Sequence, residues 1–350
     1  MRYIYAILLT GVLTGCLNDK PKERLDGEEL IEQKCAKCHN PRLSVTDVGD
    51  DFKVISAIGL DKGGKVDKAL KSKTISEGIN CLVCHNINKI NYDAPQDIRG
   101  MDRVEWNKNG IMSGPFSDAK SPYHKTQQRD FFTKNANQLC FVCHANDHSY
   151  VNKNLHFTNM QQEYKGNQKC IECHMGKKVK KYASNLPIDK GHPKVRMIRY
   201  HKFAGAHKEE MWKGALKLKA KTKANDIILS IINPQPHNIP SGFGSRELLL
   251  EISYYKGGKK VKVKNLSLTT HYKRKRSKPS TPHAAIKASK DLSIPAKGSK
   301  TFKISNSVGA NKIKIKLYYR LVNDEVRSLL KLKDKIWSKK FFIDSITVKL

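Results

Sequence analysis

The sequence predicts an α+β protein in which a part built of short helices and loops is followed by an antiparallel β-sandwich-like domain. Three observations support this fold class. Four copies of a Cys-x-x-Cys-His pattern lie between residues 35 and 174, among many glycines and turn residues. After residue 215 the chain changes to strand-length apolar runs separated by Gly-Gly, Asn-Pro and Pro-Ala-Lys-Gly turns. No helix-length periodicity lies between those runs, which favours antiparallel sheets over a βαβ arrangement.

The N-terminus has the features of an export signal. Arg2 precedes an apolar run at residues 4–13, which is too short to span a bilayer. The run ends in Leu-Thr-Gly-Cys16, which resembles the lipobox of bacterial lipoproteins, and Cys16 is the one cysteine of nine outside the repeated pattern. We therefore expect a lipoprotein signal peptide at 1–15, a lipid-modified Cys16 and a polar tether at 16–27. An ordinary signal peptide with a chance cysteine remains the alternative.

Residues 28–212 contain the four repeated patterns, and Cys-x-x-Cys-His is the attachment signature of a c-type haem. The thiols form thioethers with the haem vinyl groups, and the histidine binds the iron as its proximal axial ligand. One copy could equally be half of a zinc site or a redox dithiol, but four copies that use eight of nine cysteines favour four covalently bound c-type haems. The attachment cysteines are Cys35, Cys38, Cys81, Cys84, Cys140, Cys143, Cys170 and Cys173. The proximal histidines are His39, His85, His144 and His174.

The spacing of the patterns also predicts how this part folds. Four haems attached within about 140 residues leave little space for an aliphatic core, so porphyrin faces would supply much of the buried apolar surface. We expect a haem-packed domain in which the haems lie near one another, an arrangement that suits electron transfer.

Residues 213–350 are expected to form the β-sandwich-like domain. The strand-like runs are residues 226–232, 247–255, 259–270, 300–305, 312–322 and 341–349. Residues 327–337 are consistent with a helix or an irregular excursion. The basic run at 273–276 is interpreted as a solvated loop, with docking of an acidic partner as the alternative.

The chain is strongly basic, because 66 Lys and Arg residues against 32 Asp and Glu give a formal net charge of +34. About eight haem propionates would reduce this excess without removing it. The lysines indicate either a general preference for lysine at solvated positions or a positive surface that steers acidic redox partner proteins. Nucleic acid is not an expected partner, because c-type haems are attached after export.

Nine of the thirteen histidines lie outside the haem patterns and could supply the second axial ligand. His124 ends the segment Gly-Pro…Ser-Pro-x-His, His201 and His207 frame His-x-Phe-x-Gly-x-His, and His237 begins His-x-x-Pro-x-Gly…Arg246. With the haem patterns, these segments resemble the multihaem cytochromes c related to hydroxylamine oxidoreductase, including its tetrahaem electron acceptor, over roughly residues 28–250.

The resemblance implies bis-histidine haems. The distal ligands that it implies are His124, one or both of His201 and His207, and His237. Further candidates are His148, His156 and His192, whereas His271 and His283 are expected to be solvated.

The leading functional hypothesis is a periplasmic electron carrier, anchored to a cell-envelope membrane through its lipid, between a quinol-linked donor and a respiratory redox enzyme. The alternative is a haem enzyme that acts on hydroxylamine or on small nitrogen or sulfur oxyanions through one iron with an open position. The carrier is favoured because no pattern is Cys-x-x-Cys-Lys and because the spare histidines can fill every coordination sphere. No catalytic residue is therefore assigned.

Overall fold

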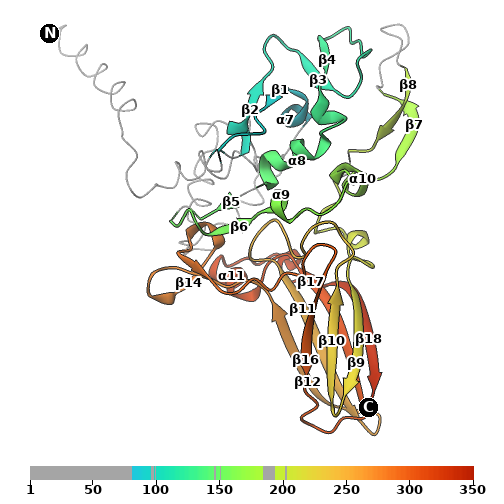
Figure 1. The fold of residues 1–350 in the computed structure, drawn as a ribbon, viewed down its shortest axis with the longest axis vertical. Helices are drawn as coiled ribbons and strands as arrows, with labels where there is room; N and C mark the ends of the chain where they lie inside the picture. Colours follow the sequence, from blue (N-terminus) through green and yellow to red (C-terminus); the bar gives the residue numbers. More distant parts are fainter. Residues whose placement is uncertain are drawn as a thin grey trace, which may run out of the picture.

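The computed structural model describes residues 81–350, apart from 96, 97, 99, 146, 150, 184–193 and 202. Cys16, the first haem pattern (Cys35, Cys38 and His39) and His192 lie outside the described residues. Figure 1 shows an N-terminal part of short helices and small hairpins above a C-terminal β-domain of long strands. Within the described ranges, no helix is long and apolar enough to cross a membrane.

Short helices carry the haem patterns of the N-terminal part. The helices are α7 (Cys81–His85), η3 (Gly100–Arg103), η4 (Asp130–Phe132), α8 (Ala136–His144), α9 (Met160–Glu163), α10 (Cys170–His174) and η6 (Glu209–Met211). The strands are β1 (Ile87–Ile90), β2 (Val104–Trp106), β3 (Met112–Gly114), β4 (Thr126–Gln128), β5 (Asp147–His148), β6 (His156–Thr158), β7 (Lys178–Tyr182) and β8 (Val195–Arg199). They pair as separate two-stranded sheets, β1 with β2, β3 with β4, β5 with β6 and β7 with β8. The apolar cluster here is small and consists of Val83, Ile87, Ile90, Phe131 and Val142.

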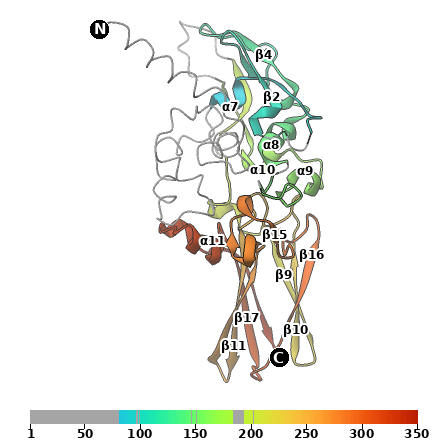
Figure 2. The same cartoon turned by 90° about the vertical axis from the view of Figure 1, so that its left-hand side faces the viewer.

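Two antiparallel sheets form the C-terminal domain and face each other across one core (Figure 2). The four-stranded sheet has the order β12 (Lys259–Leu268), β11 (Glu247–Lys256), β17 (Lys312–Arg320) and β18 (Phe341–Lys349). The three-stranded sheet has the order β16 (Ser299–Ile304), β10 (Asp226–Ile232) and β9 (Lys217–Lys223). Side chains along β10 point alternately into and away from this core. Ile227, Leu229 and Ile231 are fully buried, while their neighbours in the strand are only partly buried. Trp212 closes one end of this core by stacking on Tyr319, with ring centres 3.7 Å apart.

The mixture of helix and sheet, with antiparallel strands concentrated after residue 215, agrees with the prediction. Strand β9 was not predicted, because Leu218 is its only strongly apolar residue; it forms because it pairs along its whole length with β10. Residues 327–337 contain the end of α11 (Asp324–Leu329) and η9 (Lys335–Trp337).

The remaining short elements form a small sheet beside α11. They are β13 (Tyr272–Lys273), η7 (Lys275–Ser277), β14 (Pro279–Ser280), η8 (Pro282–Ala284) and β15 (Lys287–Ala288). His283 lies here, and the expectation that it is solvated is wrong. Its side chain is 13% exposed and its ring packs against Phe157 with centres 4.7 Å apart.

Hydrogen bonds join the two parts of the chain. The Asn152 side chain donates to the Ile286 carbonyl (2.9 Å), and the Ser149 hydroxyl donates to the His283 carbonyl (3.1 Å). On the other side of the junction, the Lys165 backbone N–H donates to the Pro236 carbonyl (2.6 Å). The loop that carries His237 is therefore held against the N-terminal part.

Candidate haem sites

The three described haem patterns converge. The Asn137 side chain accepts a hydrogen bond from the Cys170 backbone N–H (2.7 Å), which fixes the start of α10 against α8. The Cys140 and Cys170 thiols hydrogen-bond to each other, and Cys84 is close enough to Cys140 to contribute to the raised pKa of that thiol. The attachment points of three different patterns are thus gathered in one region.

Each of the three described patterns occupies one short helix, so its two cysteines, three residues apart, lie on the same helix face. In α7 these are Cys81 and Cys84. Burial, with a contribution from Cys81, raises the pKa of the Cys84 thiol to about 11.

Backbone carbonyl groups orient the proximal histidines. The Nδ1 atom of His85 lies 2.7 Å from the Ser113 carbonyl oxygen, and Nδ1 of His174 lies 2.7 Å from the Ala204 carbonyl oxygen. A carbonyl oxygen can only accept, so Nδ1 carries the proton and the lone pair is on Nε2. A backbone carbonyl that holds the Nδ1 proton in this way leaves Nε2 free to bind a metal.

Each of these two proximal histidines faces a second imidazole. The ring centres of His85 and His201 are 6.0 Å apart, and those of His174 and His237 are 6.4 Å apart. A metal–imidazole bond is about 2 Å long and the nitrogen lies about 1.2 Å from its ring centre, so two imidazoles on one metal have centres about 6.4 Å apart. Both separations are close to this value, and the ring planes are tilted by 51° and 31°, respectively.

His237 is positioned by the loop between β10 and β11. The buried Asn233 side chain donates to the carbonyls of His237 (2.8 Å) and Ile294 (3.0 Å). Nδ1 of His237 lies 2.9 Å from the Asn238 carbonyl, which again leaves Nε2 with the lone pair. Burial lowers the pKa of His237, which favours the neutral imidazole that binds metals.

The Gly and Arg of the His-x-x-Pro-x-Gly…Arg segment shape the same loop. Gly242 has φ +83°, and a β-carbon there would lie 3.2 Å from Nη1 of Arg246. That guanidinium donates to the Ser241 carbonyl (2.8 Å). A left-handed backbone and a close side chain both require glycine at 242, so these residues hold the turn that presents His237.

Residues 201–204 serve both sites. His201 faces His85, and three residues later the Ala204 carbonyl accepts from His174. Burial, and then the neighbouring His85, lowers the pKa of His201. The acceptors Ser113 and Ala204 were not identified from the sequence, because any residue type provides a carbonyl. The only available signal was their place beside the Gly-Pro…Ser-Pro-x-His segment and inside the His-x-Phe-x-Gly-x-His segment.

The other candidate histidines are arranged differently. His124, His144 and His207 are exposed, and none of the facing ring pairs described above includes them. His148 and His156 have ring centres 5.7 Å apart, but they are register partners on β5 and β6. Their backbones are only about 5 Å apart, so both side chains leave the hairpin on one face and cannot clasp a porphyrin. No group of three or more His, Cys, Asp or Glu residues in the described ranges could share a metal ion.

Comparison with known proteins gives a fold relationship. No family model matches the chain, and no curated protein matches it. Among solved structures, the chain is similar to a penta-haem cytochrome c552 from Thermochromatium tepidum, with a TM-score of 0.63 and 16% sequence identity. The similarity covers 90% of this chain and 83% of that one. The fold resembles that of a multihaem cytochrome c.

Proposed function

We propose that the chain is a lipid-anchored tetrahaem cytochrome c that carries electrons in the bacterial periplasm between a quinol-linked donor and a respiratory redox enzyme. The observation that carries the proposal is the pair of facing imidazole sets, each at the separation that one iron requires. A bound c-type haem supplies reversible one-electron iron chemistry. The chain's own residues attach it, orient the proximal imidazoles and hold the facing ones.

In this proposal each pattern supplies two thioethers and one proximal ligand. His201 is the second ligand opposite His85, and His237 is the second ligand opposite His174. His124 and His207 remain candidates for the irons bound by His39 and His144. The Cys140 and Cys170 thiols interact with each other, so haems attached to these cysteines would be neighbours, which would favour rapid electron transfer between them.

The paired imidazoles also limit which haems could be catalytic if the protein were an enzyme. Two imidazoles on one iron leave no position for a substrate, so the second and fourth sites would be closed. An open position could then exist only at the first or third pattern. A stoichiometric high-spin haem in the oxidised protein would favour the enzyme, and turnover of hydroxylamine or nitrite would be the next measurement.

Spin state tests the ligand assignment. Electron paramagnetic resonance of oxidised wild type should show low-spin signals for the second and fourth haems. His201→Ala and His237→Ala should each convert one haem of the four to high spin, because each removes one strong-field ligand. The control is His271→Ala, since this histidine is 45% exposed in the β-domain. Unchanged low-spin intensity in both ligand variants would refute the assignment.

The membrane anchor is a separate part of the proposal and rests on the lipobox-like segment. Cys16→Ser should move the haem-containing protein from the membrane fraction to the soluble periplasmic fraction, because the acylated residue is lost. Unchanged membrane association would remove the lipid anchor from the proposal and leave the haem assignment intact.

A further inference from the structure

A two-stranded ribbon projects from the N-terminal part next to the candidate haem sites. Strands β7 and β8 pair antiparallel without a register shift, and Figure 1 shows them extending beside α10. Because side chains alternate across a strand, the cross-strand pairs fall on two faces. One face carries Tyr182, Val195, Lys180, Met197, Lys178 and Arg199, and the other carries Lys181, Arg196, Val179 and Ile198.

The second of these faces is attached to the molecule. Arg196 forms an ion pair with Asp118 (2.7 Å), and its guanidinium lies 4.4 Å from the centre of the Phe116 ring. Lys194 pairs with the same carboxylate (2.8 Å). Together these contacts lower the pKa of Asp118 to about 2, with the hydrogen bond from Lys194 as the largest cause. The ribbon is thereby held with its other face outward.

The outward face combines apolar and basic side chains. Tyr182, Val195 and Met197 are 54%, 46% and 52% exposed, respectively. On the same face, Lys180 lies opposite Met197 and Lys178 lies one cross-strand pair further along, and β7 and β8 contain no acidic residue. The face therefore combines exposed apolar side chains with adjacent lysines. The lysines would attract an acidic partner, and the apolar side chains would be buried when it binds.

One end of the ribbon, where Lys178 pairs with Arg199, connects to both candidate haem sites. The Arg199 side chain donates to the Gly176 carbonyl, two residues after His174. At the same end, His201 follows Arg199 by two residues, and its ring centre lies 6.0 Å from that of His85. A protein bound on this ribbon would therefore lie beside the second and fourth sites.

We propose that the outward face of β7 and β8 is the docking surface for a small acidic electron-transfer protein. This inference rests on the proposed function, because it needs redox-active haems beside the ribbon. In the transfer step, one electron leaves the partner's reduced centre and reduces one ferric haem iron to ferrous, with no bond made or broken.

The test uses a reduced plant-type [2Fe–2S] ferredoxin, an acidic one-electron donor, and the full-length haem-loaded protein. Stopped-flow absorbance follows haem reduction under anaerobic conditions at several salt concentrations. The double variant Lys178→Glu/Lys180→Glu should lower the second-order rate constant about tenfold at low ionic strength. The difference from wild type should largely disappear in about 0.5 M salt, where exposed charges are screened.

The matched control reverses two exposed lysines of β9, Lys219→Glu/Lys221→Glu, which changes the total charge equally in the other domain. This variant should change the rate constant less than twofold. Equal effects in the two double variants would overturn the proposal, because the whole-molecule field would then explain the rate. No effect in either would also overturn it.

A third measurement distinguishes this proposal from the proposed function. Met197→Ser leaves the charge unchanged and removes an exposed apolar side chain from the outward face. It should therefore lower the rate constant at every salt concentration. Complete reduction by dithionite with a c-type haem spectrum shows that the haems are present and active. Absence of that spectrum would refute the proposed function; its presence with unaltered variant rates would refute only the docking surface.

Discussion

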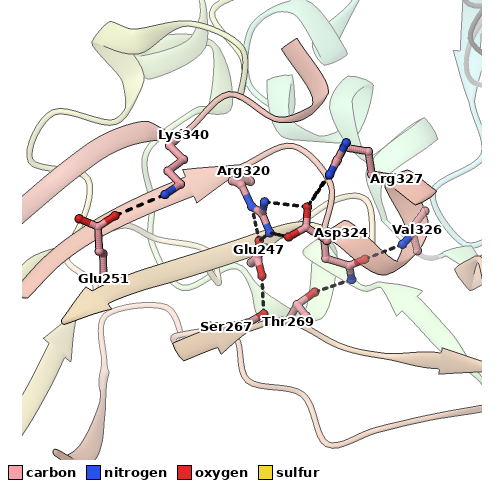
Figure 3. A network of polar contacts seen from close by, with 10 residues as sticks. Glu247, Glu251, Ser267, Thr269, Arg320, Asp324, Val326, Arg327 and Lys340 are labelled. Carbon is pink, nitrogen blue, oxygen red and sulfur yellow. Dashed lines mark hydrogen bonds and ion pairs between the residues drawn. The ribbon is translucent and has the colours of Figure 1, made fainter. Parts of the chain in front are cut away.

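Replacing Arg320 with leucine should destabilise the C-terminal domain more than any comparable change of a surface cation. Arg320 lies directly opposite Glu247 on the neighbouring strand, and both its Nε and one terminal nitrogen contact that carboxylate (Figure 3). The other contacts join the guanidinium to Asp324 at 3.0 and 2.9 Å. One side chain thus ties two central strands to the first turn of α11.

The magnitude follows from burial. The Glu247 side chain is 2% exposed and that of Arg320 is 9% exposed. Removing one partner of a buried pair leaves an uncompensated charge and costs about 3–5 kcal/mol. Loss of the Asp324 contact adds less, because that carboxylate is 60% exposed and keeps Arg327 as a partner at 3.0 Å. We expect the free energy of unfolding to fall by about 4 kcal/mol.

The assay is urea unfolding followed by far-ultraviolet circular dichroism, with haem absorbance recorded in parallel. The same sheet offers a control, the Lys340–Glu251 pair visible in Figure 3 (3.4 Å; 41% and 28% exposed). Lys340→Leu should cost less than about 1 kcal/mol, because an exposed pair gains little. The haem spectrum of the folded protein should be unchanged in both variants.

A second substitution separates the buried charge from lost packing. Glu247→Gln added to Arg320→Leu removes the uncompensated carboxylate and should restore at least half of the lost stability. If Arg320→Leu costs no more than Lys340→Leu, or if Glu247→Gln fails to restore stability, the reasoning from buried charge is wrong.

Two further predictions concern the junction between the two parts of the chain. Burial, together with Asp291, raises the pKa of Glu163 from 4.5 to about 7, so the folded protein holds a proton that the unfolded chain has released. The free energy of unfolding of the wild type should therefore fall as the pH rises from about 4.5 through 7. At pH 8, Glu163→Gln should be more stable than the wild type by about 1–2 kcal/mol. Urea unfolding at several pH values measures both effects. A stability difference independent of pH would contradict this. Gly242→Ala should destabilise the left-handed turn beside Arg246 by about 1–3 kcal/mol and displace His237. The displacement should be visible as partial high-spin character of one haem. A purely low-spin spectrum would show that the turn does not position His237.

Much of the β-domain could be predicted because its strands carry their own pattern. Residues 226–232 form β10 with the predicted bounds, since alternating apolar residues face the core. Strand β9 could not be predicted, because four lysines and a single leucine carry little periodic signal and only pairing with β10 determines its conformation. His283 was misjudged for a related reason: its environment is made by Phe157 and Phe243, which are far from it in sequence.

In the candidate haem sites, too, some residues can be predicted from local sequence and others only from the tertiary structure. Local spacing predicts the attachment cysteines and proximal histidines, because both thiols must reach one porphyrin edge from one turn of helix. The second ligands cannot be identified locally. His201 is 116 residues from His85, and His237 is 63 residues from His174, so which imidazoles face each other depends on how loops from both parts of the chain meet.

The sequence by itself predicted the cofactor class and a proximal histidine in each pattern, and it determined the presence of a β-rich tail. These are properties of short segments, where covalent geometry and side-chain alternation act between near neighbours. Only the tertiary structure decided that His201 faces His85, that His237 faces His174, and that the carbonyls of Ser113 and Ala204 orient the proximal rings. The reason is physical: an axial site needs two imidazoles on opposite sides of one iron, and chain folding alone brings such distant residues together.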